Sequence, residues 1–184
     1  AKAATLAAGE NAVVLTDGTY DTTTQGTAAL VLPAGTMIEA QHDGLALVKV
    51  PLHFDGGSVR GVVIDRTAPN AAASVQIRVL GGTVTIEGVA FRGTFSGAGT
   101  SEGIWVRNAG NVTLRPGPLT DYTADTVELT PVAGQTPFIR VEDQATMVVE
   151  GGTFGGPGLG AVPSLPANGA GAAFVVCGAG AHAP

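Results

Sequence analysis

The stretch VQIRVLGGTVTIEGVAF, from Val75 to Phe91, decides the fold that we expect for this chain. Two short runs of β-forming residues, Val75–Leu80 and Thr83–Ile86, are separated by the glycine pair Gly81-Gly82. Glycine supplies the backbone conformations that a sharp corner between two strands requires. The stretch therefore predicts short strands joined at glycine corners, and the same pattern recurs along the chain.

The recurrence of this pattern predicts a solenoid. Val79, Val106 and Val141 occupy matching strand positions and are 27 and 35 residues apart. The step from one strand to the next within a repeat is nearly constant, at five residues from Val79 to Val84. Constant inner steps and variable outer loops are typical of solenoids. We therefore predict an all-β parallel β-helix of about six coils, with residues such as Val84 and Ile86 pointing inward.

Further equivalences refine the expected coils. Ile38 and Ile64 are placed at matching positions, so the intervening segment PLHFDGGSVRG (51–61) is expected to be an inserted loop. Val176 is expected to match Val141. An antiparallel β-sandwich is the alternative, because it also has many short strands and glycine-rich turns. Sandwiches do not repeat one strand-and-turn figure, so we favour the β-helix.

Several phrases resemble a known family. TVTIEGVAF (83–91), NVTLRPGPL (111–119) and TMVVEGGTF (146–154) are similar to the coil phrase of right-handed parallel β-helix proteins of the pectin-lyase-like superfamily. The opening segments, 2–21 and 29–40, resemble the uncharacterised N-terminal β-helix domain of bacterial surface proteins. The resemblance implies a right-handed β-helix whose phrases describe the fold and carry no catalytic content.

The domain organisation is expected to be simple. One domain spans residues 1–184, with 1–10 as an N-terminal cap and 11–184 as coils. The cap rests on KAATLAA (2–8), the one convincing helical stretch, which would cover the open end of the first coil. The final segment (178–184) comes where another strand is due, so we expect a fragment of a longer protein that continues into further coils.

Composition excludes some partners. The net charge is −6, from 15 Asp and Glu residues against 9 Lys and Arg, and no basic stripe is present. Nucleic acid is therefore not an expected partner. No apolar run reaches the roughly 20 residues that a membrane-spanning helix needs. Cys177 is the single cysteine, so no internal disulfide can form, and its apolar neighbours predict a small buried side chain.

Arg78, Trp105 and Arg140 form the first candidate site. They take the same position in matching strands, so they are expected to stack as an outward strip. The indole could stack on a sugar ring while an arginine binds a carboxylate. The alternative is an exposed stack of arginine on tryptophan that binds no ligand.

An acidic column forms the second candidate site. Stacking of the predicted coils places Glu39, Asp65, Glu87, Arg115 and Glu150 in one outward column. Three acids in adjacent coils, Glu39, Asp65 and Glu87, could hold Ca²⁺, the one cofactor that we consider. The alternative is a solvated face on which Arg115 relieves the repulsion between carboxylates.

Catalytic groups are weaker candidates, and we assign no catalytic residue. Glu142-Asp143 is an adjacent acid pair at an expected turn, which does not ensure the facing geometry that glycoside hydrolysis needs. His53 and Asp55 could form a general-base pair or half a metal site, but no third group accompanies them. A loose Ca²⁺ loop is conceivable at Asp121, Asp125 and Glu128, whose spacing does not match an EF-hand.

The expected function follows from the resemblance and from these weak sites. We expect a non-catalytic structural or polysaccharide-contacting module of a bacterial secreted or cell-surface protein, with polysaccharide or other envelope proteins as partners. The alternative is a carbohydrate-active enzyme, a polysaccharide lyase or a glycoside hydrolase, because such lyases use clustered acids with an arginine or lysine base. No acid pair shares a strand with Arg78 or Arg140, which counts against a lyase site.

Overall fold

The fold is taken from a computed structural model, which describes residues 12–21, 29–66, 76–93, 103–115, 117, 139–150 and 175–177. In these ranges all regular structure is β-strand. The strands are β1 (Ala12–Leu15), β2 (Gly18–Tyr20), β3 (Leu30–Val31), β4 (Thr36–Ala40), β5 (Ala46–Val48), β6 (Leu52–Arg60), β7 (Val63–Arg66), β8 (Ile77–Glu87), β9 (Ala90–Gly93), β10 (Ile104–Val106), β11 (Asn111–Arg115), β12 (Ile139–Val141), β13 (Thr146–Val149) and β14 (Val175–Cys177). The described part contains no helix that is long and apolar enough to cross a membrane. The helix predicted within residues 2–8 lies outside the described ranges.

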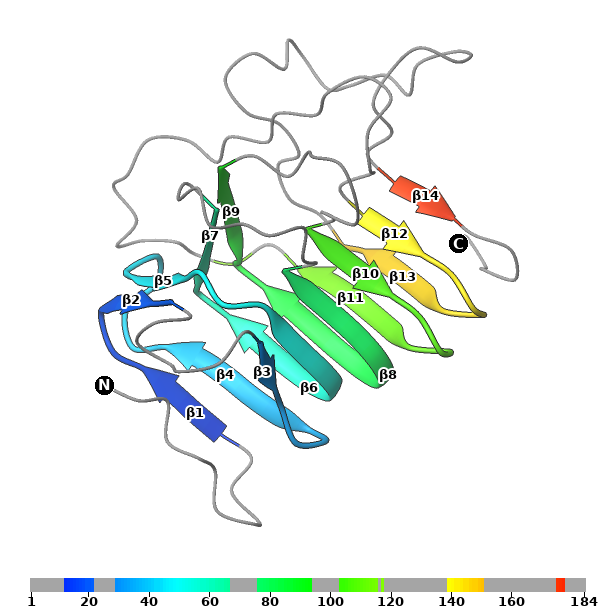
Figure 1. The fold of residues 1–184 in the computed structure, drawn as a ribbon, viewed down its shortest axis with the longest axis horizontal. Helices are drawn as coiled ribbons and strands as arrows, with labels where there is room; N and C mark the ends of the chain where they lie inside the picture. The colour runs from blue at the N-terminus through cyan, green and yellow to red at the C-terminus, as the bar shows by residue number, and fades with distance from the viewer. Residues whose placement is uncertain are drawn as a thin grey trace, which may run out of the picture.

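The strands stack side by side in three columns, which we call the first, second and third faces (Figure 1). The first face contains β3, β10, β12, β14 and the initial parts of β6 and β8. The second contains β1, β4, β11, β13 and the final parts of β6 and β8. The third contains β2, β5, β7 and β9.

Every pairing among the described strands is parallel. The chain visits the first, second and third faces in turn, as in the series β3, β4, β5 and then β6, β7. An antiparallel sandwich is therefore excluded for these strands. The arrangement is all-β with parallel strands, and it is consistent with a β-helix.

The corner between the first and second faces uses left-handed backbone. Gly57 in β6 and Gly82 in β8 have φ angles of 117° and 66°. A Cβ atom on Gly57 would lie 2.0 Å from the carbonyl oxygen of Thr36 in the coil below, so only glycine fits there. In the later coils the pairs Asn108-Ala109 and Asp143-Gln144 turn the corner, with φ between 53° and 62°.

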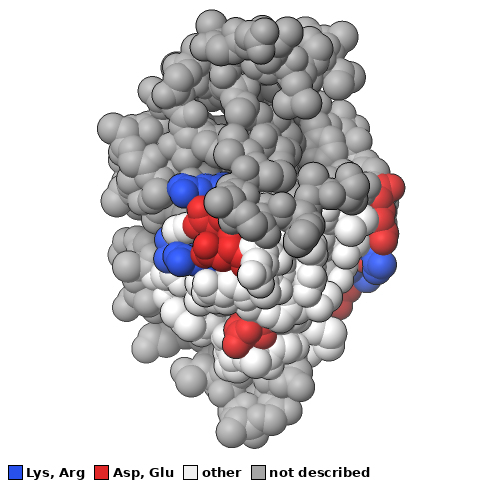
Figure 2. Space-filling view, turned by 90° about the vertical axis from the view of Figure 1, so that its right-hand side faces the viewer, with Lys and Arg blue, Asp and Glu red and all other residues white. Residues whose placement is uncertain are grey.

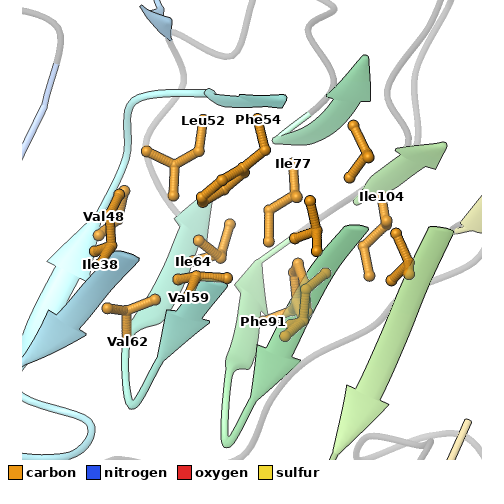
Figure 3. Close-up of a cluster of buried hydrophobic side chains, with 14 of the residues drawn as sticks. Ile38, Val48, Leu52, Phe54, Val59, Val62, Ile64, Ile77, Phe91 and Ile104 are labelled. Carbon is orange, nitrogen blue, oxygen red and sulfur yellow. The ribbon is translucent and has the colours of Figure 1, made fainter. Parts of the chain in front are cut away.

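The core is built from stacked aliphatic side chains. In β8, Ile77 and Val79 are fully buried on either side of the half-buried Arg78, as strand alternation requires. Ile104 and Ile139 continue the column of Ile77 in register, about 4.8 Å apart along the stack. Figure 3 shows how such side chains from successive coils meet inside the stack. The predicted inward residues Val84 and Ile86 are buried, at 0% and 3% exposure.

The prediction of an inserted loop at residues 51–61 is wrong, because most of this segment forms strand β6. Leu52 and Phe54 are buried in β6 and pair with Ile77 and Val79, because the pattern Leu-His-Phe repeats Ile-Arg-Val. Consequently Ile64 does not match Ile38 and lies on the third face. In the next coil, the residue that pairs with Ile38 is Val59.

The last equivalence is also shifted, by one residue. Cys177, and not Val176, pairs with Val141, while Val176 pairs with Arg140. A shift of one residue exchanges the inner and outer positions of a strand, because successive side chains point to opposite sides.

Candidate functional site

The outer side of the second face carries a column of alternating charges. Glu39, Arg60, Glu87 and Arg115 are in register on β4, β6, β8 and β11. Glu150 follows β13 and binds Arg115, which extends the column by one acid. We call these five residues the charge ladder. The predicted column contained Asp65 in place of Arg60, and this is wrong because β6 supplies the second-face strand of that coil.

The arginines of the charge ladder bind carboxylates of neighbouring coils, and Arg60 bridges two of them. Arg60 lies 3.0 Å from an oxygen of Glu39 and 3.2 Å from an oxygen of Glu87. Arg115 donates to both carboxylate oxygens of Glu150, at 2.6 and 3.3 Å. These hydrogen bonds and charges raise the pKa of Arg115, and the hydrogen bond from Arg115 lowers the pKa of Glu150. Two arginines therefore offset two of the three carboxylate charges of the ladder on an exposed face.

The three residues predicted to hold Ca²⁺ do not come together. Glu39 and Glu87 are separated in the ladder by Arg60, which binds both. Asp65 lies on the third face, is 3% exposed, and forms an ion pair of 3.4 Å with Lys49. Within the described ranges, no group of three or more His, Cys, Asp or Glu residues is placed to hold a metal ion.

The outer side of the first face carries the predicted strip of Arg78, Trp105 and Arg140. Trp105 in β10 pairs with Arg78 in β8 on one side and with Arg140 in β12 on the other. The central guanidinium carbons of Arg78 and Arg140 lie 4.7 and 5.3 Å from the centre of the indole ring. The two arginines reach the ring from the strands on either side of β10, as the predicted strip requires.

A third arginine and a carboxylate complete this site. Arg107 lies 4.9 Å from the centre of the Trp105 ring. Glu142 accepts a hydrogen bond of 2.9 Å from the indole N–H and another of 3.0 Å from Nε of Arg140. We call Arg78, Trp105, Arg107, Arg140 and Glu142 the tryptophan cluster. The sequence analysis missed Arg107 and the binding role of Glu142, although both directly follow strands of the repeated pattern Ile-x-Val.

The charges of the tryptophan cluster are unevenly matched. Arg140 forms an ion pair with Glu142, with 2.8 Å between a guanidinium nitrogen and a carboxylate oxygen. Arg107 forms an ion pair with Asp143, with 3.4 Å between the corresponding atoms. The side chain of Arg78 has no ion pair or hydrogen bond within the described residues, and its Nε is buried without a partner there. Asp143 lies at a turn with left-handed backbone, as the sequence predicted for the acid pair. The two acids therefore act as partners of arginines.

His53 lies beside the unpaired arginine. Its position in β6 pairs with Arg78 in β8, and the side chain is partly buried. Burial and the nearby charge of Arg78 lower the pKa of His53 from 6.5, so the ring is neutral at pH 7. Asp55 lies on the same strand and is exposed, next to an irregularity in the pairing.

Figure 2 views the molecule along the stack and shows where the charges gather. Lys or Arg side chains lie against Asp or Glu side chains in two groups, one on each side of the view. The charge ladder and the tryptophan cluster belong to different faces of the stack, so they are separate sites. The predicted Ca²⁺ loop at Asp121, Asp125 and Glu128 lies outside the described residues, and of Cys177 only the backbone position in β14 is described.

Comparison with known proteins gives one family. The sequence model of a family described as "Protein of unknown function (DUF1565)" matches residues 1–154. Neither a curated protein nor a solved structure matches the chain.

Proposed function

The chain belongs to the family of proteins of unknown function DUF1565, and we propose that it is a non-catalytic β-helix module that contacts polysaccharide through the tryptophan cluster. The observation that carries this proposal is the gathering of three arginines around one indole, one of which, Arg78, has no carboxylate partner among the described residues. Three of the nine Lys and Arg residues of an acidic chain surround Trp105. Arginine and tryptophan are the side chains that most often dominate binding surfaces.

The form of the first face supports the same proposal. The cluster lies on the outer side of parallel strands whose inner side chains are packed, so its backbone is held rigidly. Residues spaced by about 4.8 Å along a solenoid can contact successive parts of an extended polymer. A rigid, extended surface limits the entropy that the protein loses when a long ligand binds.

The wider assignment is part of the proposal. The parallel stack and the family match over residues 1–154 support a right-handed β-helix of about six coils, similar to those of the pectin-lyase-like superfamily. In this proposal the N-terminal residues cap the first coil. The module belongs to a bacterial secreted or cell-surface protein, where polysaccharide or other envelope proteins are its partners.

The state of the carboxylates argues against the enzymatic alternative. Glycoside hydrolysis needs two carboxyl groups that face each other across the substrate. In the tryptophan cluster Glu142 is held by Trp105 and Arg140, and the neighbouring Asp143 is held by Arg107. Both acids are therefore engaged as partners of arginines, which favours binding over hydrolysis.

Affinity electrophoresis in gels that contain one soluble polysaccharide each would test the proposal. We expect at least one polysaccharide to retard the protein, and the substitution Arg78→Gln to reduce the retardation. Arg60→Gln serves as the matched control, because it removes an arginine from the charge ladder, which lies on a different face. Assays for reducing and unsaturated sugar ends on the same mixtures are expected to show no product.

Two results would contradict the proposal. If no polysaccharide retards the protein, the cluster is not a polysaccharide contact. If sugar ends are released by the protein and are no longer released by Arg78→Gln, the module is an enzyme.

A further inference from the structure

Arg78 differs from the other arginines of the tryptophan cluster because its charge is not neutralised. Arg140 and Arg107 each have a carboxylate partner, at 2.8 and 3.4 Å. Within the described residues the side chain of Arg78 has neither an ion pair nor a hydrogen bond, and its contact with Trp105 is to the ring. A guanidinium group presents several N–H donors in one plane, which match the oxygens of a carboxylate or a sulfate.

His53 provides a second donor next to this free guanidinium. The two residues pair across adjacent strands, about 4.8 Å apart along the stack. The side chain of His53 also has no hydrogen-bond partner among the described residues, and no carboxylate forms an ion pair with either side chain in that part of the chain. On its other side His53 pairs with Val31 of β3, which is not titratable. The charged groups near it are therefore Arg78 and, two residues further along β6, the exposed Asp55.

We propose that Arg78 and His53 form a subsite for one anionic group, a carboxylate or a sulfate, and that His53 takes up a proton when the anion binds. The inference rests on the proposed function, because it names the chemical group of the polysaccharide that the first face binds. It also limits the role of the other arginines: Arg140 and Arg107 hold the indole and its acids in place, and Arg78 receives the ligand.

The physical reason for the proton uptake is the balance of charge around His53. In the free protein the charge of Arg78 and partial burial keep the imidazole neutral. A bound anion offsets the charge of Arg78 and accepts a hydrogen bond from the protonated ring, so it favours the imidazolium form. By linkage the same anion binds more tightly at lower pH. Carboxylates of sugar acids and sulfates stay ionised near pH 5.5, so the ligand keeps its charge.

The test uses the whole chain and inorganic sulfate as the first probe. The pKa of His53 is measured by NMR of its ring C–H signals, with and without sodium sulfate at constant ionic strength. We expect a saturable rise in the pKa of His53 with sulfate, and sulfate binding that tightens about threefold to tenfold between about pH 7.5 and about pH 5.5. Arg78→Gln is expected to abolish the rise, whereas Arg60→Gln preserves it. His42, whose ring binds Asp17 at 2.9 Å, provides an internal reference in the same spectra.

The second probe distinguishes a free anion from an acidic sugar. A uronic-acid oligosaccharide and a neutral oligosaccharide of the same length are titrated into the protein and into His53→Gln. Tighter binding of the acidic oligomer, with a pH dependence that His53→Gln removes, supports the inference. If His53 responds to neither sulfate nor the uronic acid, the inference is overturned.

The two proposals can fail separately. Equal binding of neutral and acidic oligomers without pH dependence would overturn the anion subsite and leave polysaccharide contact intact. A response of His53 to sulfate, with no retardation by any polysaccharide, would support the subsite and contradict the proposed function.

Discussion

The indole N–H of Trp105 donates a 2.9 Å hydrogen bond to Glu142, a residue 37 positions later in the chain. The same carboxylate accepts a hydrogen bond from Arg140, which contacts the Trp105 ring from the neighbouring strand. Glu142 is 17% exposed, so these bonds are formed with little competition from water. One carboxylate therefore fixes the orientation of the ring and neutralises one of its three arginines.

Replacement of Glu142 by Gln is expected to strengthen the binding of anionic polysaccharide. The amide oxygen of Gln can still accept a hydrogen bond from Trp105, but the charge of Arg140 is no longer offset. We expect the affinity for an acidic oligosaccharide to rise severalfold, and the free energy of unfolding to fall by about 1–3 kcal/mol. Calorimetric titration and urea unfolding measure the two effects.

Asp143→Asn is a suitable comparison for Glu142→Gln. It removes the partner of Arg107 at a turn where Asn tolerates the left-handed backbone, and it leaves Glu142 in place. An unchanged or weaker affinity in Glu142→Gln would show that Arg140 does not reach the ligand even when its charge is free.

His53 is expected to make the protein less stable in weak acid. Its pKa is lowered in the folded state from 6.5, so the unfolded chain takes up the proton first as the pH falls. Stability is therefore lost as the pH drops below 6.5 towards the pKa of the folded state, and is retained above it. His53→Gln is expected to reduce this loss. The test is the difference in unfolding free energy between wild type and variant at about pH 7.5 and about pH 5.5. If the unfolding free energy depended on pH equally in both proteins, the prediction would be contradicted.

Arg60 is expected to be the critical member of the charge ladder. Arg60 bridges Glu39 and Glu87. The substitution Arg60→Glu would place a third carboxylate between these two. Like charges directly opposite on neighbouring strands are destabilising, so we expect a loss of about 1 kcal/mol relative to Arg60→Gln. Urea unfolding at low and at high NaCl measures the loss. The gap between the two variants is expected to narrow at high salt, because exposed charges are screened. A gap that does not depend on salt would exclude repulsion as its cause.

Gly57 is expected to tolerate no side chain. A Cβ atom there would lie 2.0 Å from the carbonyl oxygen of Thr36, so Gly57→Ala forces two coils apart. Gly35→Ala is the matched control, because Gly35 also has a positive φ but has nothing within 4 Å of the added atom. We expect Gly35→Ala to cost about 1–2 kcal/mol through backbone strain alone, and Gly57→Ala to cost clearly more. Thermal unfolding followed by circular dichroism applies even if the second variant is barely folded. Similar costs for both variants would show that the coils yield easily at this corner.

The candidate site was partly predictable, because its members share one strand position. The pattern Ile-Arg-Val, Ile-Trp-Val and Ile-Arg-Val places Arg78, Trp105 and Arg140 on the outside of matching strands, and the pairing of β8, β10 and β12 confirms it. The position of His53 beside Arg78 was not predicted, because Leu-His-Phe precedes an Asp-Gly-Gly segment that is typical of a turn. In the structure that glycine pair is the corner within β6 and lies beside the corner of β8, where Asp55 pairs with Gly81 and Gly57 pairs with Val84.

The sequence by itself determined the all-β class, the parallel stacking of the repeated strands, and the inward positions of residues such as Val84 and Ile86. These follow from local rules: alternation decides which side chains are buried, and glycines mark the corners. Only the tertiary structure decided which residues from different coils meet. In the register of β6, Arg60 lies between Glu39 and Glu87, and His53 lies beside Arg78. Because β6 supplies the second-face strand, Asp65 lies on the third face. Register depends on how whole coils pack against each other, and a shift of one residue in that packing exchanges the inner and outer side chains.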